Sequence, residues 1–407
     1  MTKSKSKSPQ IFRRHLALLV VPGLLAVGTS LTLGNVTVAN QTTKEQKSAD
    51  ISRDRQVSPA KAPKISNTQP VLISNNPKPQ PSYATIPNPG IVKVAQAQNK
   101  RPPGVKANVI RIGFQQAGDL VRTSGAIERR LAPLGVKVEW AQFAQGPQLM
   151  EAMNVGRVDI GSVGETPPIF AQAAGARLVY LVGTRRTANS GRSSIIAVPP
   201  NSPIRSVRDL KGKTVIFQRA SASQYFIAKA LEQAGLKYSD IKVQSLPTVE
   251  SYQPFIQGKI PVWVAGDPYY ALAEKQGKIR VLRTAQGIAT PGSYYIGDRK
   301  FAVENPGILR IVIEEIDKVQ RRAEANPKET IQTLVKFQKL PEDVAKRVVS
   351  RRVFGLRGIN ENLIREQQEV ADYFFKLNLL PRRINIREAT LTPQQYAAIT
   401  PPTIPQR

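Results

Sequence analysis

From residue 108 onward, the hydrophobic and polar positions alternate between two periods. The first apolar run, VIRIGF (109–114), alternates as a half-buried strand does. The next segment, GDLVRTSGAIERRLAPLG (118–135), repeats its apolar residues with helical spacing and ends at a glycine. Strand and helix patterns continue in turn as far as RLVYLVGT (177–184). Strands that alternate with helices of this length predict βαβ units around a parallel sheet.

The same alternation starts again at SSIIAVPP (193–200). Further strand patterns follow in KTVIF, IKVQSL, PVWVAG and KIRVLRT, and SYYIGDRKF (293–301) is typical of a last strand. From about residue 305 the apolar spacing is helical. We therefore predict an α/β protein with two βαβ lobes, a cleft between the lobes and a C-terminal helical tail.

The first hundred residues follow neither period. The basic stretch MTKSKSKSPQIFRR precedes the short apolar run HLALLVVPGLLAVG, which predicts an export signal over residues 1–28, with an uncleaved N-terminal anchor as the alternative. The paired arginines also fit a twin-arginine signal, and no cysteine is present to carry a lipid anchor. Residues 29–107 are rich in Ser, Thr, Asn, Gln, Pro and Lys, so we predict a disordered tether there.

The composition of the chain excludes several kinds of binding and catalytic site. The 407 residues carry a formal charge of +30, and residues 108–407 hold 43 Lys and Arg against 26 Asp and Glu. Because these basic residues are scattered, without a dense patch interleaved with aromatic residues, and because the chain is predicted to be exported, we favour a surface that attracts small anions over one that binds nucleic acid. Cysteine is absent and His15 is the only histidine, which excludes thiol and histidine catalysis and metal sites built on either residue from the predicted lobes.

Two turns of similar sequence each carry an acid. NVGRVDIGSVGETPP (154–168) and IQGKIPVWVAGDPYY (256–270) both run from a helix stop through a strand to a glycine, then to Glu165 or Asp267. Ligands of open parallel sheets lie beyond the carboxyl ends of the strands, so both turns are predicted to line the cleft. Taken singly, ordinary helix capping by Thr166 and Asp267 is the simpler interpretation. The two interpretations are compatible, since a capped helix N-terminus at a cleft is also an anion site.

Two further turns carry donors suited to an anion. QRASASQYFIAKAL places Ser221, Ser223 and Gln224 at a strand-to-helix turn, where backbone N–H groups and the helix dipole favour an oxyanion. The alternative is a serine N-cap, and the phosphate-binding pattern GxxxxGK[ST] is absent. In GFQQAG, the amide of Gln115 can donate to a ligand, unless that loop is simply exposed.

The region from about 108 to 390 resembles the solute-binding component of ABC importers for aliphatic sulfonates, in the taurine, nitrate and sulfonate class. The resemblance is carried by RIGFQQAG, by the long block from RLAPLG through GPQL to GETPPIFAQAAGARLVYL, and by SPIRSVRDLKGKTV, ALEQAGLKYSDI, DPYYALAEKQGKIRVL and LPRRINIREA. It implies the bilobed type II periplasmic-binding-protein fold, with two chain crossings near SIIAVPP and GSYYIG. The implied divisions are a first lobe with the helical tail over 108–192 and 292–390, a second lobe over 193–291, and a flexible tail over 391–407.

The resemblance implies a periplasmic, monomeric binding protein that needs no cofactor and has no enzymatic activity. It would capture a small organosulfonate, alkanesulfonate or taurine-like, and deliver it to a membrane-embedded ABC permease. Another solute, such as nitrate, bicarbonate or a vitamin precursor, is the alternative. An enzyme on the same fold is a weaker one, because the pyrimidine synthases related to this fold consume a histidine that the predicted lobes lack.

Matched by motif, the resemblance implies eight ligand-facing residues: Gln115, Glu165, Thr166, Ser221, Ser223, Gln224, Asp267 and Tyr269. The chain departs from the family where Pro261 replaces an aspartate and Gly266 replaces a tryptophan before the DPY turn. The family also has aspartate more often than glutamate at the first acidic turn. These departures predict a reshaped pocket, and thus a ligand larger than, or different from, a simple alkanesulfonate.

The two acids conflict with a permanently anionic ligand. Either each carboxylate is satisfied by its own helix N–H groups, or one of them meets an ammonium on a zwitterion such as taurine. Arg185 and Arg186 follow the strand YLVGT and can bring positive charge to the cleft. We favour the interpretation of both arginines as solvated loop charges.

Overall fold

The computed structural model describes residues 101–115, 119–288 and 292–405, and the chain divides into two units, Met1–Gly90 and Ile91–Arg407. All described residues belong to the second unit, so the predicted signal (1–28) and the predicted tether as far as residue 100 lie outside them. The last residues predicted as tether, 101–107, pack on the fold, because the backbone N–H groups of Lys106 and Ala107 both donate to Asn305 Oδ1. No described helix is long and apolar enough to cross a membrane.

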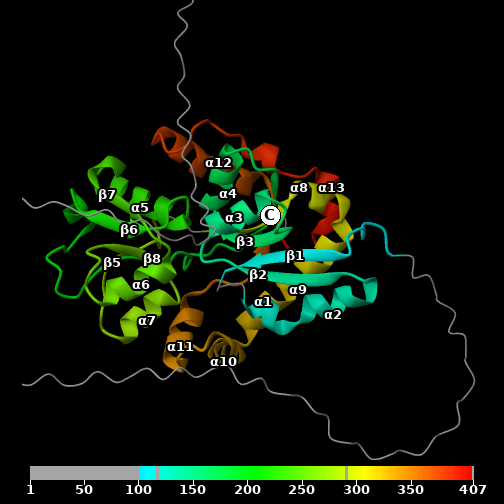
Figure 1. The fold of residues 1–407 in the computed structure, drawn as a ribbon, viewed down its shortest axis with the longest axis horizontal. Coiled ribbons are helices and arrows are strands. Elements are labelled where there is room, and N and C mark those ends of the chain that lie inside the picture. Colours follow the sequence, from blue (N-terminus) through cyan, green and yellow to red (C-terminus); the bar gives the residue numbers. More distant parts are fainter. Residues whose placement is uncertain (1–100, 116–118, 289–291, 406–407) are drawn as a thin grey trace, which may run out of the picture. The chain divides into compact units, whose positions relative to one another are not determined.

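Two mixed sheets form the frame of the second unit (Figure 1). The six-stranded sheet has the order β11-β4-β10-β3-β1-β2 and the five-stranded sheet the order β7-β6-β8-β5-β9. The strands β1–β3 and β6–β8 pair in parallel within each sheet, whereas β10 and β5 run antiparallel to their neighbours. The first sheet consists of β1 (Val109–Phe114), β2 (Lys137–Gln142), β3 (Ile160–Gly164), β4 (Leu178–Thr184), β10 (Ser293–Asp298) and β11 (Leu356–Arg357); the second consists of β5 (Ser194–Val198), β6 (Thr214–Phe217), β7 (Lys242–Ser245), β8 (Trp263–Gly266) and β9 (Arg280–Thr284).

The helices cover the faces of these sheets, as the βαβ pattern predicts. The segment expected as one helix over 118–135 is broken at Gly125, which adopts φ 60°, so that two short helices follow each other. The α-helices are α1 (Asp119–Ser124), α2 (Ala126–Leu131), α3 (Gly146–Asn154), α4 (Thr166–Ala173), α5 (Ala222–Gln233), α6 (Thr248–Ile256), α7 (Tyr269–Lys275), α8 (Arg299–Glu304), α9 (Pro306–Ala325), α10 (Pro327–Gln338), α11 (Glu342–Arg351), α12 (Glu361–Lys376) and α13 (Pro393–Ile399).

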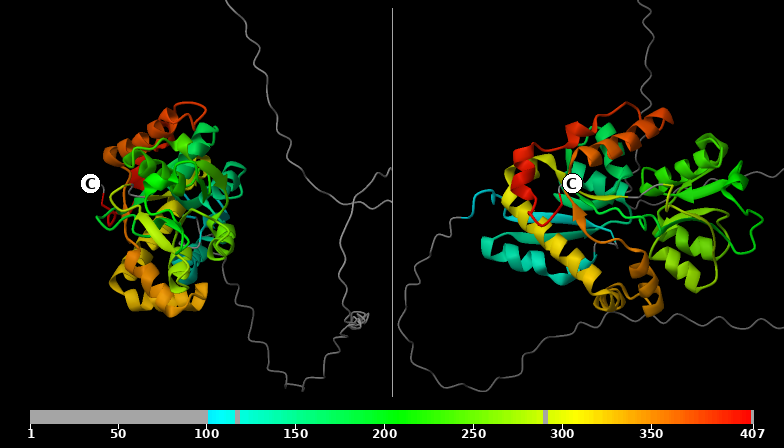
Figure 2. Two further views of the ribbon diagram at one scale, coloured as in Figure 1. Left: turned by 90° about the vertical axis from the view of Figure 1, so that its left-hand side faces the viewer. Right: turned by 180° about the vertical axis from the view of Figure 1, so that it is seen from behind.

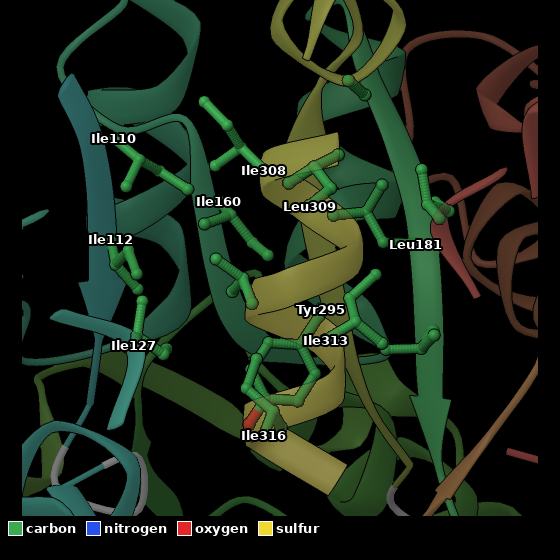
Figure 3. Packing of buried hydrophobic residues seen from close by; sticks show 14 of the residues in the cluster. Ile110, Ile112, Ile127, Ile160, Leu181, Tyr295, Ile308, Leu309, Ile313 and Ile316 are labelled. Carbon is green, nitrogen blue, oxygen red and sulfur yellow. The ribbon is translucent and has the colours of Figure 1, made fainter. Parts of the chain in front are cut away.

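Helix α9 packs on one face of the six-stranded sheet (Figure 3). Its apolar residues recur at intervals of three and four, and Ile308, Leu309 and Ile313 are fully buried as a result. They pack against Ile110 of β1 and Ile160 of β3, whose side chains leave the same face of the sheet. Burial of side chains of this size contributes about 1.5–3 kcal/mol each, so the α9 stripe anchors the first lobe.

The chain crosses twice between the sheets, between β4 and β5 and between β9 and β10. Both crossings precede the segments expected from the sequence, SIIAVPP and GSYYIG, which form β5 and β10 themselves. The crossings lie side by side, because Gln286 Nε2 donates to the carbonyl of Ala188 at 2.8 Å. Gly191 makes this approach possible: it adopts φ 89°, and a Cβ there would lie 2.7 Å from the carbonyl carbon of Ala285.

The C-terminal residues are part of the fold rather than a flexible tail. Helix α13 packs along α9, and Ile399 and Ile404 are buried in the core that α9 organises. Arg310 on α9 also donates to the carbonyl of Thr400 at 3.3 Å. The sequence expectation for residues 391–407 missed this because two isolated isoleucines among prolines give no periodic signal.

The close approach at the crossings predicts different costs for two glycine substitutions. Gly175→Ala, at φ 93° in open space, is expected to lose about 1–2 kcal/mol from the left-handed backbone alone. Gly191→Ala adds a clash with the Ala285 backbone and should lose a further ~1–3 kcal/mol. Urea unfolding of the full chain measures both variants, and equal losses would contradict the tight contact between the crossings.

Candidate functional site

The two acidic turns lie at the carboxyl ends of β3 and β8, where the sequence places them, but their acids point to different surroundings. Glu165 is buried at the start of α4 and Asp267 precedes α7. The Glu165 turn touches the second lobe, since a Cβ on Gly164 would lie 3.0 Å from the Cβ of Ala222. The turn at the start of α4 and the serine-rich turn at the start of α5 therefore meet across the lobe boundary.

Glu165 is fully buried near the lobe boundary, where its carboxylate interacts with the charge of Arg186 and with Tyr225 of α5. Gln367 on α12 donates to the backbone carbonyl of Glu165 and to the hydroxyl of Tyr180. The carboxylate accepts a long hydrogen bond from Thr166, at 3.5 Å, and one from its own backbone N–H, and its Oε2 has no partner. Desolvation raises the pKa of Glu165 to about 7, although the nearby charge of Arg186 lowers it in part.

Helix α4 does not carry the side-chain cap expected from Thr166. Glu165 occupies the N-cap position, Thr166 is already the first helical residue, and no side-chain cap hydrogen bond forms. The hydroxyl of Thr166 is directed to Glu165 Oε1 instead of to the helix backbone. The prolines at 167 and 168 explain this helix start, because they fix φ and have no N–H to be capped.

Asp267 is held by an arginine from the helical tail. Its Oδ1 accepts from the backbone N–H of Ala271 at 3.1 Å and from Arg351 Nη1 at 3.2 Å. Arg351 also forms an ion pair with Glu274 and lies over the ring of Tyr270 at 3.9 Å. Burial raises the pKa of Asp267 to about 6, and the charge of Arg351 offsets this only in part. Because α11 packs on α7, these contacts tie the tail to the second lobe.

The predicted donors on α5 are partly committed to the second lobe. Ser221 is buried and donates to the carbonyl of Gln218 at 2.7 Å. Gln224 accepts from Ala220 N at 2.6 Å and donates to the Tyr238 hydroxyl at 3.0 Å, so its amide stabilises the turn. Ser223 is half-buried at the first turn of α5.

The remaining two predicted residues lie apart from each other. Gln115, at the end of β1, donates from Nε2 to the carbonyl of Ser162 on β3 at 3.0 Å. Tyr269 begins α7, and its ring packs on Tyr252 of α6 at 5.3 Å between centroids. The structure thus groups Glu165, Thr166 and the α5 residues at one place, and Asp267 at another.

A cavity of about 210 Å³ lies where the carboxyl ends of β3 and β4, the first crossing, the Asp267 turn and the α10–α11 pair meet. Hydroxyl groups line it from five directions, and three guanidinium groups stand against one carboxylate. The hydroxyl residues are Ser162, Thr184, Ser190, Ser193, Ser293 and Tyr295, the charged residues are Arg185, Arg351, Arg352 and Asp267, and Leu334, Val348 and Val353 add apolar surface. This lining suits a small anion with an apolar part.

Arg186 is not the solvated loop charge that the sequence suggested, whereas Arg185 is, with a side chain 44% exposed. Arg185 lines the cavity and pairs with Glu324. Arg186 has a side chain only 18% exposed and pairs with Glu366 at 2.7 Å, close to Glu165. No local pattern predicts that Glu366, on α12, lies near this loop, because the two residues are 180 positions apart.

The sequence interpretation missed Arg351 and Arg352. Their segment, PEDVAKRVVSRR, was expected only as a tail helix, and nothing local indicates that its end reaches the cavity. Among the described residues, no group of three or more acids, histidines or cysteines is arranged to hold a metal ion.

Comparison with known proteins places this geometry in a family. Residues 132–330 match the family model described as NMT1/THI5 like. A relative from Escherichia coli strain K12, named as an aliphatic sulfonates-binding protein, is 36% identical over 290 residues, which cover 70% of this chain and 89% of the relative. The chain belongs to the aliphatic sulfonate-binding protein family. The family is one of solute-binding proteins of ABC importers.

Solved structures of the family have the same fold. The alkanesulfonate-binding protein SsuA of Xanthomonas axonopodis pv. citri, bound to MOPS, aligns with a TM-score of 0.67 and 30% identity over 70% of this chain and 99% of its own. The periplasmic aliphatic sulphonate binding protein SsuA of Escherichia coli aligns with a TM-score of 0.61 and 35% identity over 71% of this chain and 93% of its own. These alignments confirm the predicted family and the bilobed type II fold with its helical C-terminal region.

Removal of the Arg351 side chain tests the contact between α11 and α7. Arg351→Met leaves the buried Asp267 carboxylate without its cation, which should cost about 3–5 kcal/mol of unfolding free energy. Lys275→Met is the matched control, because it breaks the exposed Lys275–Asp343 pair between the same two helices and should cost far less. Urea unfolding compares the two, and equal losses would refute a special role for Arg351.

The raised pKa of Glu165 predicts a pH dependence of stability. Between the unfolded value near 4.5 and the folded value of about 7, the folded chain binds the extra proton, so stability is fully present below pH 4.5 and falls as pH rises to 7. The total loss for this group is up to about 3 kcal/mol.

Glu165→Gln removes that loss and should stabilise the protein at pH 8 relative to the native sequence, with little difference at pH 4.5. Asp267, whose pKa is also raised, titrates in both proteins and cancels in the difference. Unfolding curves at several pH values measure this difference in unfolding free energy between the variant and the native protein. A constant offset between the two proteins from pH 4.5 to 8 would show that Glu165 is not buried with a raised pKa.

Proposed function

We propose that this chain is an exported solute-binding protein that captures a small organosulfonate in the cavity between its lobes and delivers it to a membrane-embedded ABC permease. The observation that best supports this function is the composition of the cavity. Three guanidinium groups and a set of hydroxyls line it beside one carboxylate, Asp267, which Arg351 already neutralises. The sulfonate class is supported by the relatives, whose names and bound ligand are sulfonates.

The chemistry of the lining fits a sulfonate head. Three oxygens that carry a permanent negative charge accept hydrogen bonds in several directions, and serine and threonine hydroxyls rotate to donate to them. Guanidinium groups add charge-assisted hydrogen bonds, which are about twice as strong as neutral ones. The enclosure strengthens these interactions, because fewer water molecules compete in a small shielded cavity.

Closure of the two lobes gives the protein a way to report that it is occupied. The lobes are joined by the two crossings, and they touch at Gly164 with Ala222 and at Gln145, whose Nε2 donates to Thr248 Oγ1 at 3.0 Å. Hinge closure around such crossings is a common response of bilobed proteins to a ligand. A permease that recognises the closed form would receive the loaded protein selectively.

We further propose that the protein binds its ligand without changing it, uses no cofactor and acts as a monomer. The only histidine is His15, and cysteine is absent, so a histidine general base and a cysteine nucleophile are missing from the cavity. Export to the periplasm is supported by the basic and apolar N-terminal sequence and by the periplasmic Escherichia coli relative.

Thermal unfolding of the full chain with a panel of anions tests the proposal. A sulfonate at about 100 times its dissociation constant should add about 2.7 kcal/mol of stability, which raises the melting temperature visibly. The panel comprises 1-butanesulfonate, taurine, sulfate, nitrate and bicarbonate. A shift with nitrate or bicarbonate and none with any sulfonate would leave the solute-binding role in place and refute the substrate class.

A further inference from the structure

The helices α10 and α11 form one wall of the cavity, although they belong to the tail that follows both lobes. Figures 1 and 2 show the pair beside α7 of the second lobe, and α11 packs on α7. On α11, Val348 and Arg351 lie one helical turn apart; Arg352 follows the end of the helix, and all three line the cavity. The wall is therefore apolar at one level and positively charged at the next, about 5.4 Å further along the helix.

Arg352 is the guanidinium best placed to meet an anion. It follows the last helical residue of α11, lies over the ring of Phe354 at 5.2 Å, and is surrounded by protein except where it borders the cavity. Tyr295 lines the same cavity, and its hydroxyl accepts from Gln320 Nε2 at 3.5 Å. Desolvation lowers the pKa of Arg352 from its ordinary value.

The apolar part of the wall comes from both helices. Leu334 of α10 and Val348 of α11 are largely buried in the small core shared by α7, α10 and α11, and both retain an edge on the cavity. A hydrocarbon chain placed against them would bury apolar surface at about 0.8 kcal/mol per methylene.

The cavity offers little to an ammonium group. Asp267 is the only acid among the described lining residues, its Oδ1 is held by Arg351 and Ala271, and its Oδ2 is buried, without a hydrogen-bond partner. Glu165, the other candidate acid, is buried against Gln367 and Tyr180 in the first lobe. An ammonium in the cavity would lose its hydration and face guanidinium groups.

We propose that the α10–α11 pair determines which sulfonate is bound: Arg352 anchors the sulfonate, and Leu334 and Val348 receive a short uncharged hydrocarbon chain. This assignment rests on the proposed function, and it selects between the alkanesulfonate and taurine-like ligands. The specificity then lies in the tail helices rather than in the facing turns of the two lobes.

Titration calorimetry of the full chain with ethane-, butane- and hexanesulfonate and with taurine tests the selectivity. The affinity should rise about three- to fourfold per added methylene until the cavity is filled, and taurine should bind at least tenfold more weakly than ethanesulfonate. Val348→Ala enlarges the apolar part and should shift the preference toward the longer chain. Equal or tighter binding of taurine would overturn the proposal, as would an affinity independent of chain length.

Arg352→Gln tests the anchor and should weaken the binding of every sulfonate at least tenfold. Arg347→Gln is the matched control: it removes the same charge from α11, but Arg347 is half exposed, lies 3.6 Å from Glu274 and does not line the cavity. The affinity of the Arg347→Gln variant for sulfonates should stay within twofold of that of the native protein. Arg352→Lys keeps the charge without the planar donors, so its sulfonate affinity should lie between those of Arg352→Gln and the native protein.

The outcomes distinguish the proposed sulfonate-binding function from the role of Arg352 as the anchor. Absence of binding by any sulfonate to the native protein would refute the proposed function. Sulfonate binding that Arg352→Gln leaves unchanged would refute the anchor alone. If Arg352→Gln fails to fold, as thermal unfolding without ligand would show, Arg352→Lys and the chain-length series in the native protein still decide the matter.

Discussion

The ion pair between Arg351 and Asp267 is the interaction on which the geometry of the cavity depends. It fixes the end of α11 against the turn before α7, and so brings a helix of the C-terminal tail to the second lobe. The pair is shielded from water, because the side chain of Arg351 is only 12% exposed and that of Asp267 only 6%. Glu274 and the ring of Tyr270 complete the surroundings of the guanidinium. The same attachment carries Arg352 and Val348 to the cavity wall.

This attachment also explains how a protein with acids at both lobe turns can bind an anion. Asp267 is neutralised by the tail arginine, and Glu165 is buried with a pKa raised to about 7, so that it is protonated in part near neutral pH, with the charge of Arg186 nearby. The sequence left two options for these acids. The first, in which an acid is satisfied by the N–H groups of its own helix, is seen for Asp267, whose Oδ1 accepts from the backbone N–H of Ala271. The positive charge for the ligand comes from residues that the turns themselves do not contain.

Local periodicity was enough to predict the two lobes, the positions of the acidic turns and the helical tail, because strands and helices of this length leave a clear pattern. It did not predict pairs far apart in the sequence, such as Arg351 with Asp267 or Arg186 with Glu366, 84 and 180 residues apart. The tight surroundings of Gly266 are seen only in the structure: a Cβ there would lie 3.2 Å from the carbonyl oxygen of Ser193 in the first crossing. Ligand contacts of the eight predicted residues remain predictions.

The most direct measurement is an electron-density map of the full chain crystallised with 1-butanesulfonate. The account predicts that the sulfonate oxygens lie within hydrogen-bond distance of Arg352 and the hydroxyls beside it, with the butyl chain against Leu334 and Val348. A sulfonate found instead between Thr166 and Ser223, at the facing turns of α4 and α5, would contradict the central role of the tail helices.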